Sequence, residues 1–339
     1  MAMNTTPIPP RVSNAAASSR RWRDLVLLGG LVLLVVVGLV GLAAATGWEE
    51  TMAALGRLSI GEFSILLLLS LTNYFGRSMR WHLFAGQLGL GTGFWLNTRH
   101  FLGGFAMSVT PGRVGELVRM RWIRRETGWS FERTAPLVLV DRAADLSAMA
   151  VLLALSLAFA ATGLSGGAPV AILALIAAFV VTRPKLLRSI SDAAYRSTGK
   201  RMPRLFARVR RAARSLEAFT HPSTLVLASI CGVAGWFAEG YAFYLLLKWM
   251  GADIGLWLAV GIFILATLAG GLTGAPGGLG GAEAAMVALL AVQNVPLEIA
   301  VPATLIIRVT TLWFAIGIGL AIFPFAERHS RKAENALER

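Results

Sequence analysis

Apolar runs long enough to cross a lipid bilayer dominate this sequence. A bilayer core about 30 Å thick requires about 20 apolar residues in a helix, and residues 25–45 reach that length without a charge. Further apolar runs occupy residues 63–84, 94–109, 136–161, 168–182, 224–250, 256–272, 282–292 and 298–325. Charged residues make up only 15% of the chain, whereas soluble domains carry about 25%. The sequence therefore predicts an all-α integral membrane protein and excludes an ordinary soluble enzyme.

Positive charges assign a direction to these runs. Six arginines lie between residues 113 and 133, and eleven Lys and Arg residues lie between 183 and 214. Loops rich in Lys and Arg stay in the cytoplasm. We therefore expect one transmembrane domain, 25–325, in the inner or plasma membrane. Its disordered N-terminus, 1–24, and its tail, 326–339, are both expected to be cytoplasmic. The six expected full spans are 25–45 (an uncleaved span rather than a signal peptide), 63–84, 136–161, 168–182, 224–250 and 298–325.

Two stretches, 103–120 and 270–286, are broken by a Pro-Gly pair and further glycines. Proline and glycine interrupt helices, and irregular backbone at membrane depth is tolerated only where protein or water satisfies its polar groups. We therefore expect two re-entrant hairpins. The first, 94–122, enters from the cytoplasm, and the second, 256–292, enters from outside.

The broken stretches belong to an internal repeat. Pro136, Arg142 and Leu146 follow the first Pro-Gly pair as Pro302, Arg308 and Leu312 follow the second. Repeat 1 covers about 63–161 and repeat 2 about 224–325, joined by the span 168–182 and the basic segment 183–222. Their opposite expected orientations make them inverted repeats, which are typical of secondary transporters with a site near the membrane midplane. A duplicated scaffold without transport is the alternative.

Ionisable residues inside a membrane are costly, and most are functional or paired. Asp141 and Asp145 are four residues apart and share a helix face, so structural ion pairs with Arg80 or Arg308 are one interpretation. Arg142 projects about 100° away from them, toward a different partner. Arg142 and Arg308 are repeat mates and are expected to face each other. The two arginines of 63–84 could instead snorkel to the inner surface. The residues expected to act in coupling or ion pairing are Arg80, Glu116, Asp141, Asp145, Glu239 and Glu283.

The turns favour an anion site. Thr110 can cap a helix that begins at Pro111, and Pro276 can begin the second inner helix in the same way. Two helix N-termini at the midplane would attract a phosphate or a carboxylate. Glu116 and Glu283 either suit the dipoles of these helices or carry protons. The predicted substrate-binding residues are Thr110, Pro111, Gly112, Arg113, Arg119, Arg142, Pro276, Gly277, Gly278 and Arg308.

Three motifs, PGRVGELVR at 111–119, DRAADL at 141–146 and APGGLGGAE at 275–283, resemble the transmembrane region of lysylphosphatidylglycerol synthases. The resemblance covers about residues 25–325. In bifunctional members this region is similar to a flippase domain, which moves aminoacylated phospholipid after a soluble domain makes it. Because residues 326–339 leave no room for that soluble domain, the resemblance implies lipid translocation without synthase activity. The residues it implicates are Arg113, Glu116, Arg119, Asp141, Arg142, Asp145, Glu283 and Arg308.

The sequence therefore predicts a flippase or transporter for an anionic lipid of the phospholipid or polyprenyl-phosphate type. An intramembrane headgroup enzyme using Glu116, Asp141 and Asp145 is one alternative, and an accessory or scaffold subunit is another. The single cysteine and four scattered histidines indicate no metal site and no cofactor,.

The basic segment 183–222 predicts a second kind of lipid contact. Its residues 204–219 place apolar side chains on one helical stripe with arginines beside it, which favours an interfacial helix on anionic lipid. A plain cytoplasmic loop is the alternative. The net charge of +14 thus indicates which segments lie in the cytoplasm. We expect no nucleic-acid partner.

Overall fold

The structure, a computed structural model, describes residues 58–108, 110, 114–160, 183–197, 199, 216–219 and 221–337, together with isolated positions elsewhere. For residues 114–116, Pro184 and Pro276 it describes the backbone alone. Every regular element in these ranges is helical, which confirms the prediction of an all-α protein. The expected spans 25–45 and 168–182 lie outside the described residues.

Two long helices, α3 (Ile60–Gln87) and α10 (Pro222–Trp249), pack along each other. Ser59 begins α3 with a capping box: its hydroxyl accepts from the Glu62 amide, and the Glu62 carboxylate accepts from the Ser59 amide,. Pro222 begins α10, where a missing N–H costs nothing,. Each helix has 28 residues and, at about 1.5 Å per residue, is about 42 Å long, enough to cross a bilayer core.

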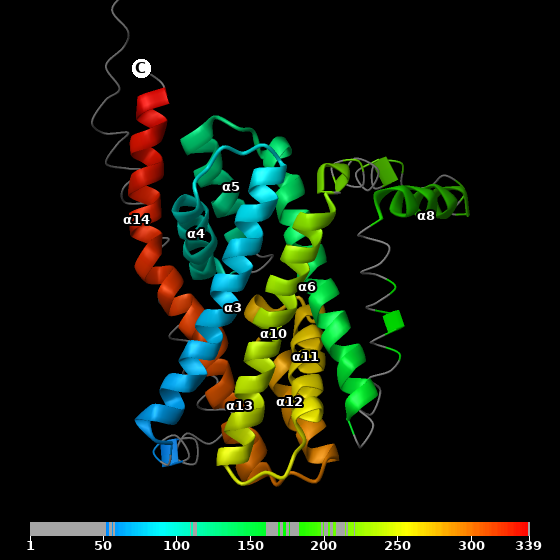
Figure 1. The fold of residues 1–339 in the computed structure, drawn as a ribbon, viewed down its shortest axis with the longest axis vertical. Helices are drawn as coiled ribbons and strands as arrows, with labels where there is room; N and C mark the ends of the chain where they lie inside the picture. Colours follow the sequence, from blue (N-terminus) through cyan, green and yellow to red (C-terminus); the bar gives the residue numbers. More distant parts are fainter. Residues whose placement is uncertain are drawn as a thin grey trace, which may run out of the picture. The chain divides into compact units, whose positions relative to one another are not determined.

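The two halves of the bundle have a similar order of elements: a long helix, a shorter helix, a 3-10 turn, another short helix and a final long helix, which in the second half runs from Leu297 to Leu337 through a π-helical turn. After α3 come α4 (Phe94–Gly103), the turn η1 (Gly104–Met107), α5 (Val114–Thr127) and α6 (Phe131–Phe159). After α10 come α11 (Leu256–Leu272), η4 (Pro276–Gly278), α12 (Gly281–Val292), α13 (Leu297–Arg308), the π-helical turn η5 (Val309–Trp313) and α14 (Phe314–Leu337). Pro136 and Pro302 lie at the same distance from the starts of α6 and α13. Figure 1 shows α4 and α5 toward one end of the bundle and α11 and α12 toward the other.

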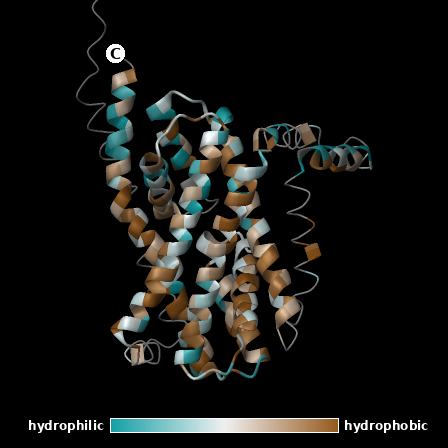
Figure 2. Ribbon diagram, viewed as in Figure 1, coloured by the Kyte–Doolittle hydropathy of each residue, from teal (hydrophilic) through white to brown (hydrophobic). Residues whose placement is uncertain are grey.

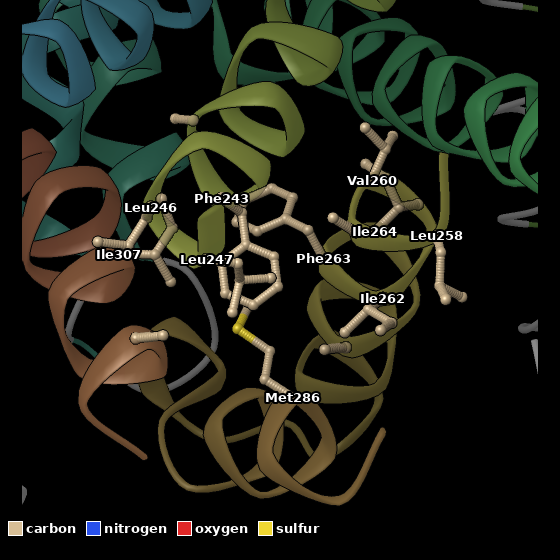
Figure 3. Packing of buried hydrophobic residues seen from close by; sticks show 14 of the residues in the cluster. Phe243, Leu246, Leu247, Leu258, Val260, Ile262, Phe263, Ile264, Met286 and Ile307 are labelled. Carbon is tan, nitrogen blue, oxygen red and sulfur yellow. The ribbon is translucent and has the colours of Figure 1, made fainter. Parts of the chain in front are cut away.

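Close backbone contacts with α10 hold α3, which carries arginines, in the centre of the bundle. A Cβ atom on Gly76 would lie 2.9 Å from the carbonyl oxygen of Cys231, and one on Gly235 would lie 3.2 Å from Cα of Asn73. Glycine at these positions therefore lets the backbones of α3 and α10 touch. Beyond this contact, Phe243 and Leu247 of α10 pack with Met286 of α12 in the apolar core (Figure 3).

The outer surface carries the composition of a membrane protein. Large apolar side chains such as Leu68, Phe75, Val226 and Ile230 are exposed on α3 and α10. Hydrophilic residues gather on α5, on α8 (Pro184–Ser197) and on the C-terminal part of α14 (Figure 2). Among the described helices, α10 and the continuous helix Leu297–Leu337 are long and apolar enough to cross a membrane. Helices α3 and α6 also have the length and carry buried charges.

Candidate functional site

A cavity of about 710 Å³ lies among the helices where the two glycine-rich turns approach each other. A Cβ atom on Gly277 would lie 3.7 Å from the carbonyl oxygen of Ser108, so the second turn lies close to the end of η1. Apolar side chains such as Met149 and Phe263 form part of the wall. The polar side chains that line the cavity are Tyr74, Arg77, Ser108, Thr110, Arg119, Arg142, Asp145, Trp236, Glu239, Thr267, Arg308 and Thr311. Four arginines and two carboxylates leave its lining with an excess of positive charge.

Arg80 joins α3 to α6 behind the wall of this cavity. Its Nη2 atom lies 2.6 Å from Oδ1 of Asp141 and 2.7 Å from Oδ1 of Asp145. Arg77 adds a contact of 2.8 Å to the other oxygen of Asp145. The pairing of both aspartates with Arg80 agrees with the interpretation of the sequence in which the two aspartates form structural ion pairs. The alternative, in which the two arginines snorkel to the inner surface, is wrong for Arg80, because its side chain is fully buried.

Arg142 contacts both aspartates of its own helix. It follows Asp141 directly in α6, and the sequence predicts that its side chain can serve a different partner. Its long side chain curls back, so that its Nη atoms lie 3.3 Å from Asp141 Oδ2 and 3.4 Å from Asp145 Oδ2. A flexible guanidinium can cover the angle that separates neighbouring Cβ atoms. Its side chain keeps 31% exposure and lines the cavity.

Arg308, which the sequence predicts to be the repeat mate of Arg142, holds the second turn in place. Its Nε atom lies 2.5 Å from Glu283 Oε1, and its Nη2 atom donates to the carbonyl oxygen of Gly277 at 2.8 Å. The sequence interpretation left Arg80 or Arg308 as the partner of the aspartates of α6; Arg80 takes that place, and Arg308 pairs with Glu283 instead. Glu283 does lie in the first turn of α12, where a carboxylate suits the helix dipole.

The second inner helix begins later than the sequence predicts. It begins at Gly281, since Pro276 opens only a short 3-10 turn and Gly277 and Gly278 have φ of 61° and 69°. These positive φ values favour glycine. In the first inner helix the structure describes α5 from Val114 onward, and the Thr110 hydroxyl donates to the Met107 carbonyl at 2.6 Å. The predicted residues Pro111, Gly112 and Arg113 and the side chain of Glu116 lie outside the described residues.

Arg119 reaches the cavity from α5. Its guanidinium lies 4.2 Å from the centre of the Phe101 ring and donates to the Phe101 carbonyl oxygen at 2.9 Å. The ring centres of Trp81 and Phe105 lie farther from the same guanidinium, at 5.4 Å and 5.7 Å. Cation–π contact of this kind helps to hold a buried guanidinium in place.

A comparison with known protein families shows which family the chain belongs to. The family model for the lysylphosphatidylglycerol synthase TM region matches residues 26–319. The chain belongs to this family. Two UPF0104 membrane proteins of Methanothermobacter thermautotrophicus are also similar: one is 32% identical over 90 residues, the other 30% over 107 residues. These matches cover 26% and 32% of this chain and 27% and 32% of the relatives, so the chain spans about a third or less of their length.

The family match extends over nearly all of the described cavity, and it is a match to the membrane region alone. The expected site residues whose side chains the structure describes divide into two groups. Those that line the cavity are Thr110, Arg119, Arg142, Asp145, Glu239, Gly277, Gly278 and Arg308. Arg80, Asp141 and Glu283 lie behind this wall and hold its side chains.

Sequence reasoning missed a cluster at the polar end of α14. The carboxylate of Glu327 accepts from Arg121 at 2.6 Å, from Arg125 at 2.6 Å and from the Trp122 indole at 2.8 Å. Burial opposes the charged form, but these hydrogen bonds and charges outweigh it and lower the pKa of Glu327. The cluster fastens α5 to α14. The only signal in the sequence is a lone glutamate just beyond a long apolar run.

Proposed function

We propose that this protein moves an anionic lipid, of the phospholipid or polyprenyl-phosphate type, across the membrane. The observation that carries the proposal is the arginine-lined cavity among membrane helices. Arg142 and Arg308 would hold the phosphate, and Arg77 and Arg119 would add positive charge around it. Arginine suits phosphate because its planar fork donates two parallel hydrogen bonds. The apolar part of the wall would accept the first carbons of the acyl or prenyl chains.

The architecture supports alternating access. The similar element order in both halves, with α4 and α5 at one end and α11 and α12 at the other (Figure 1), is what an inverted repeat with two re-entrant hairpins produces. Rocking one repeat against the other would expose the cavity to each side in turn. The charge distribution favours cytoplasmic termini in the cell membrane.

A headgroup enzyme built on α6 is less well supported. All four carboxylate oxygens of Asp141 and Asp145 accept contacts from Arg77, Arg80 or Arg142 or from the Trp236 indole. A general base needs a lone pair directed at its substrate. The carboxylate oxygens of both aspartates are instead directed at arginines.

We also propose that the basic segment 183–222 rests on anionic lipid. The described part of it contains α8, in which the apolar residue Ile190 and the basic residues Lys185 and Arg196 are exposed. The sequence placed the amphipathic helix at 204–219, most of which lies outside the described residues. Replacing Lys185 and Arg196 with glutamine should weaken the preference of the intact protein for nanodiscs rich in phosphatidylglycerol.

Reconstitution tests the main proposal. Purified protein in liposomes should expose fluorescent phosphatidylglycerol or polyprenyl phosphate to a membrane-impermeant quencher. Loss of a charge-assisted contact costs about 1.5–3 kcal/mol, so Arg308→Gln should slow exposure by about tenfold or more. The exposed residue Arg328 of α14 provides a matched control, because Arg328→Gln leaves the cavity unchanged. Wild-type protein that moves neither lipid would overturn the proposal, and equal rates for wild type and Arg308→Gln would favour an accessory role.

A further inference from the structure

Glu239 is a buried carboxylate without a partner in the part of the chain that the structure describes. It lies in the middle of α10 and lines the cavity, with a relative exposure of 5%. The other buried carboxylates around the cavity each make an ion pair with an arginine. No described side chain makes a hydrogen bond or an ion pair with Glu239. An unpaired buried carboxylate is expensive as an anion, so it needs either a mobile cation or a proton.

The repeat explains why this carboxylate has no partner. Glu239 holds the same place in α10 as Arg77 holds in α3, counted from the starts of two helices of equal length. Arg77 is paired with Asp145 of α6. The equivalent of Asp145 in the second repeat is Thr311, which carries no charge. The first repeat thus holds a closed ion pair where the second repeat holds a single ionisable group.

The surroundings of Glu239 link its charge to that of a bound anion. The ionisable groups that face it are Tyr74 and Arg77 from α3, Asp145 from α6 and Arg308 from α13. Helix α11, which also packs against α10, has no ionisable residue. In the empty cavity, burial favours the protonated form of Glu239, whereas the positive charges of Arg77 and Arg308 favour its carboxylate. An anion bound to Arg308 offsets that charge and adds its own repulsion, so it favours the protonated form.

We infer that Glu239 takes up a proton when an anionic headgroup binds, and releases it when the headgroup leaves. This inference rests on the proposed transport function. One proton from the solvent joins the carboxylate as one negative phosphodiester enters, so the cavity keeps its net charge. Headgroup and proton then cross together, and an inward or outward proton gradient would set the direction of lipid movement.

Binding of dihexanoylphosphatidylglycerol to the full chain in detergent tests the inference. This lipid is a phosphodiester and does not itself titrate near neutral pH. Calorimetry in two buffers of different ionisation enthalpy should show uptake of about one proton per bound lipid, and affinity should rise by about tenfold for each unit that the pH falls above the pKa of Glu239. Glu239→Gln should bind with an affinity that is independent of pH and should take up no proton.

Two further variants keep the experiment decisive. Glu239→Asp retains a carboxyl group and should retain proton uptake, while Glu298→Gln, at an exposed position of α13, should behave as wild type. Binding by wild type without proton uptake would overturn the inference and leave the proposed function standing. The same pH dependence in folded Glu239→Gln and wild type would also overturn it. If wild type binds neither this lipid nor a polyprenyl phosphate, both the inference and the proposed function fail.

Discussion

Arg80 and Asp141 form an ion pair that water does not reach: their side chains are 0% and 1% exposed, and Nη2 lies 2.6 Å from Oδ1. The pair joins α3 to α6 behind the cavity wall. Because a charge left alone in such a place cannot be solvated, each partner depends on the other. The pair therefore supports Asp145, Arg77 and Arg142 in the positions that shape the cavity.

Replacing Arg80 with methionine should destabilise the protein strongly. Breaking a buried ion pair by removing one partner costs about 3–5 kcal/mol, since Asp141 keeps a buried charge. Thermal unfolding in detergent measures the effect. Arg80→Met combined with Asp141→Asn should recover part of the loss, and Arg196→Gln on α8 should change little. A double variant no more stable than Arg80→Met alone would contradict this account.

Gly277→Ala should destabilise the second turn. Its φ of 61° costs a residue with a Cβ atom about 1–2 kcal/mol, and the added atom would lie 3.1 Å from Leu312. Gly317 in α14 is the matched control, because a Cβ atom there meets nothing within 4 Å. Gly317→Ala should be neutral or stabilising, as alanine favours a helix. Thermal unfolding and the liposome assay report both effects, and equal melting temperatures for the two variants would count against the argument.

Arg308→Lys should fail to replace the arginine even though the charge remains. A lysine has one ammonium group and cannot hold the Glu283 carboxylate and the Gly277 carbonyl as Nε and Nη2 do,. We expect slower lipid movement and a lower melting temperature. Arg142→Lys, at a more exposed position, should lose less. The interpretation is wrong if the two lysine variants lose activity equally.

Glu327 should make stability depend on pH at the polar end of α14. Its pKa in the folded protein lies below the ordinary value of 4.5, so the unfolded chain binds a proton first as pH falls. The stabilisation is therefore fully present above that value and is lost as pH falls toward the folded pKa. Glu327→Gln should be less stable than wild type at neutral pH, and the gap in melting temperature should close in acid. A gap that stays constant would exclude this origin.

Much of the fold follows from local patterns. The length of each apolar run predicts α3, α6 and α10, and the spacing of Asp141 and Asp145 predicts a shared face and a common arginine. The glycines predict breaks near Pro111 and Pro276, although proline as the first helical residue is the wrong start at the second turn. Local chemistry supports a turn there, but the positive φ values of Gly277 and Gly278 delay the second helix to Gly281.

The sequence by itself determined that this is a helical membrane protein with charges set inside apolar segments, because hydrophobic length and helical period are local properties. Only the tertiary structure decided which charges meet. Arg308 pairs with Glu283 and Arg142 folds back on its own helix, since helix packing and the reach of a flexible side chain select the partner. The same packing leaves Glu239 alone opposite Arg77 and Arg308. Its isolation is a property of the assembled cavity that no spacing along the chain reveals.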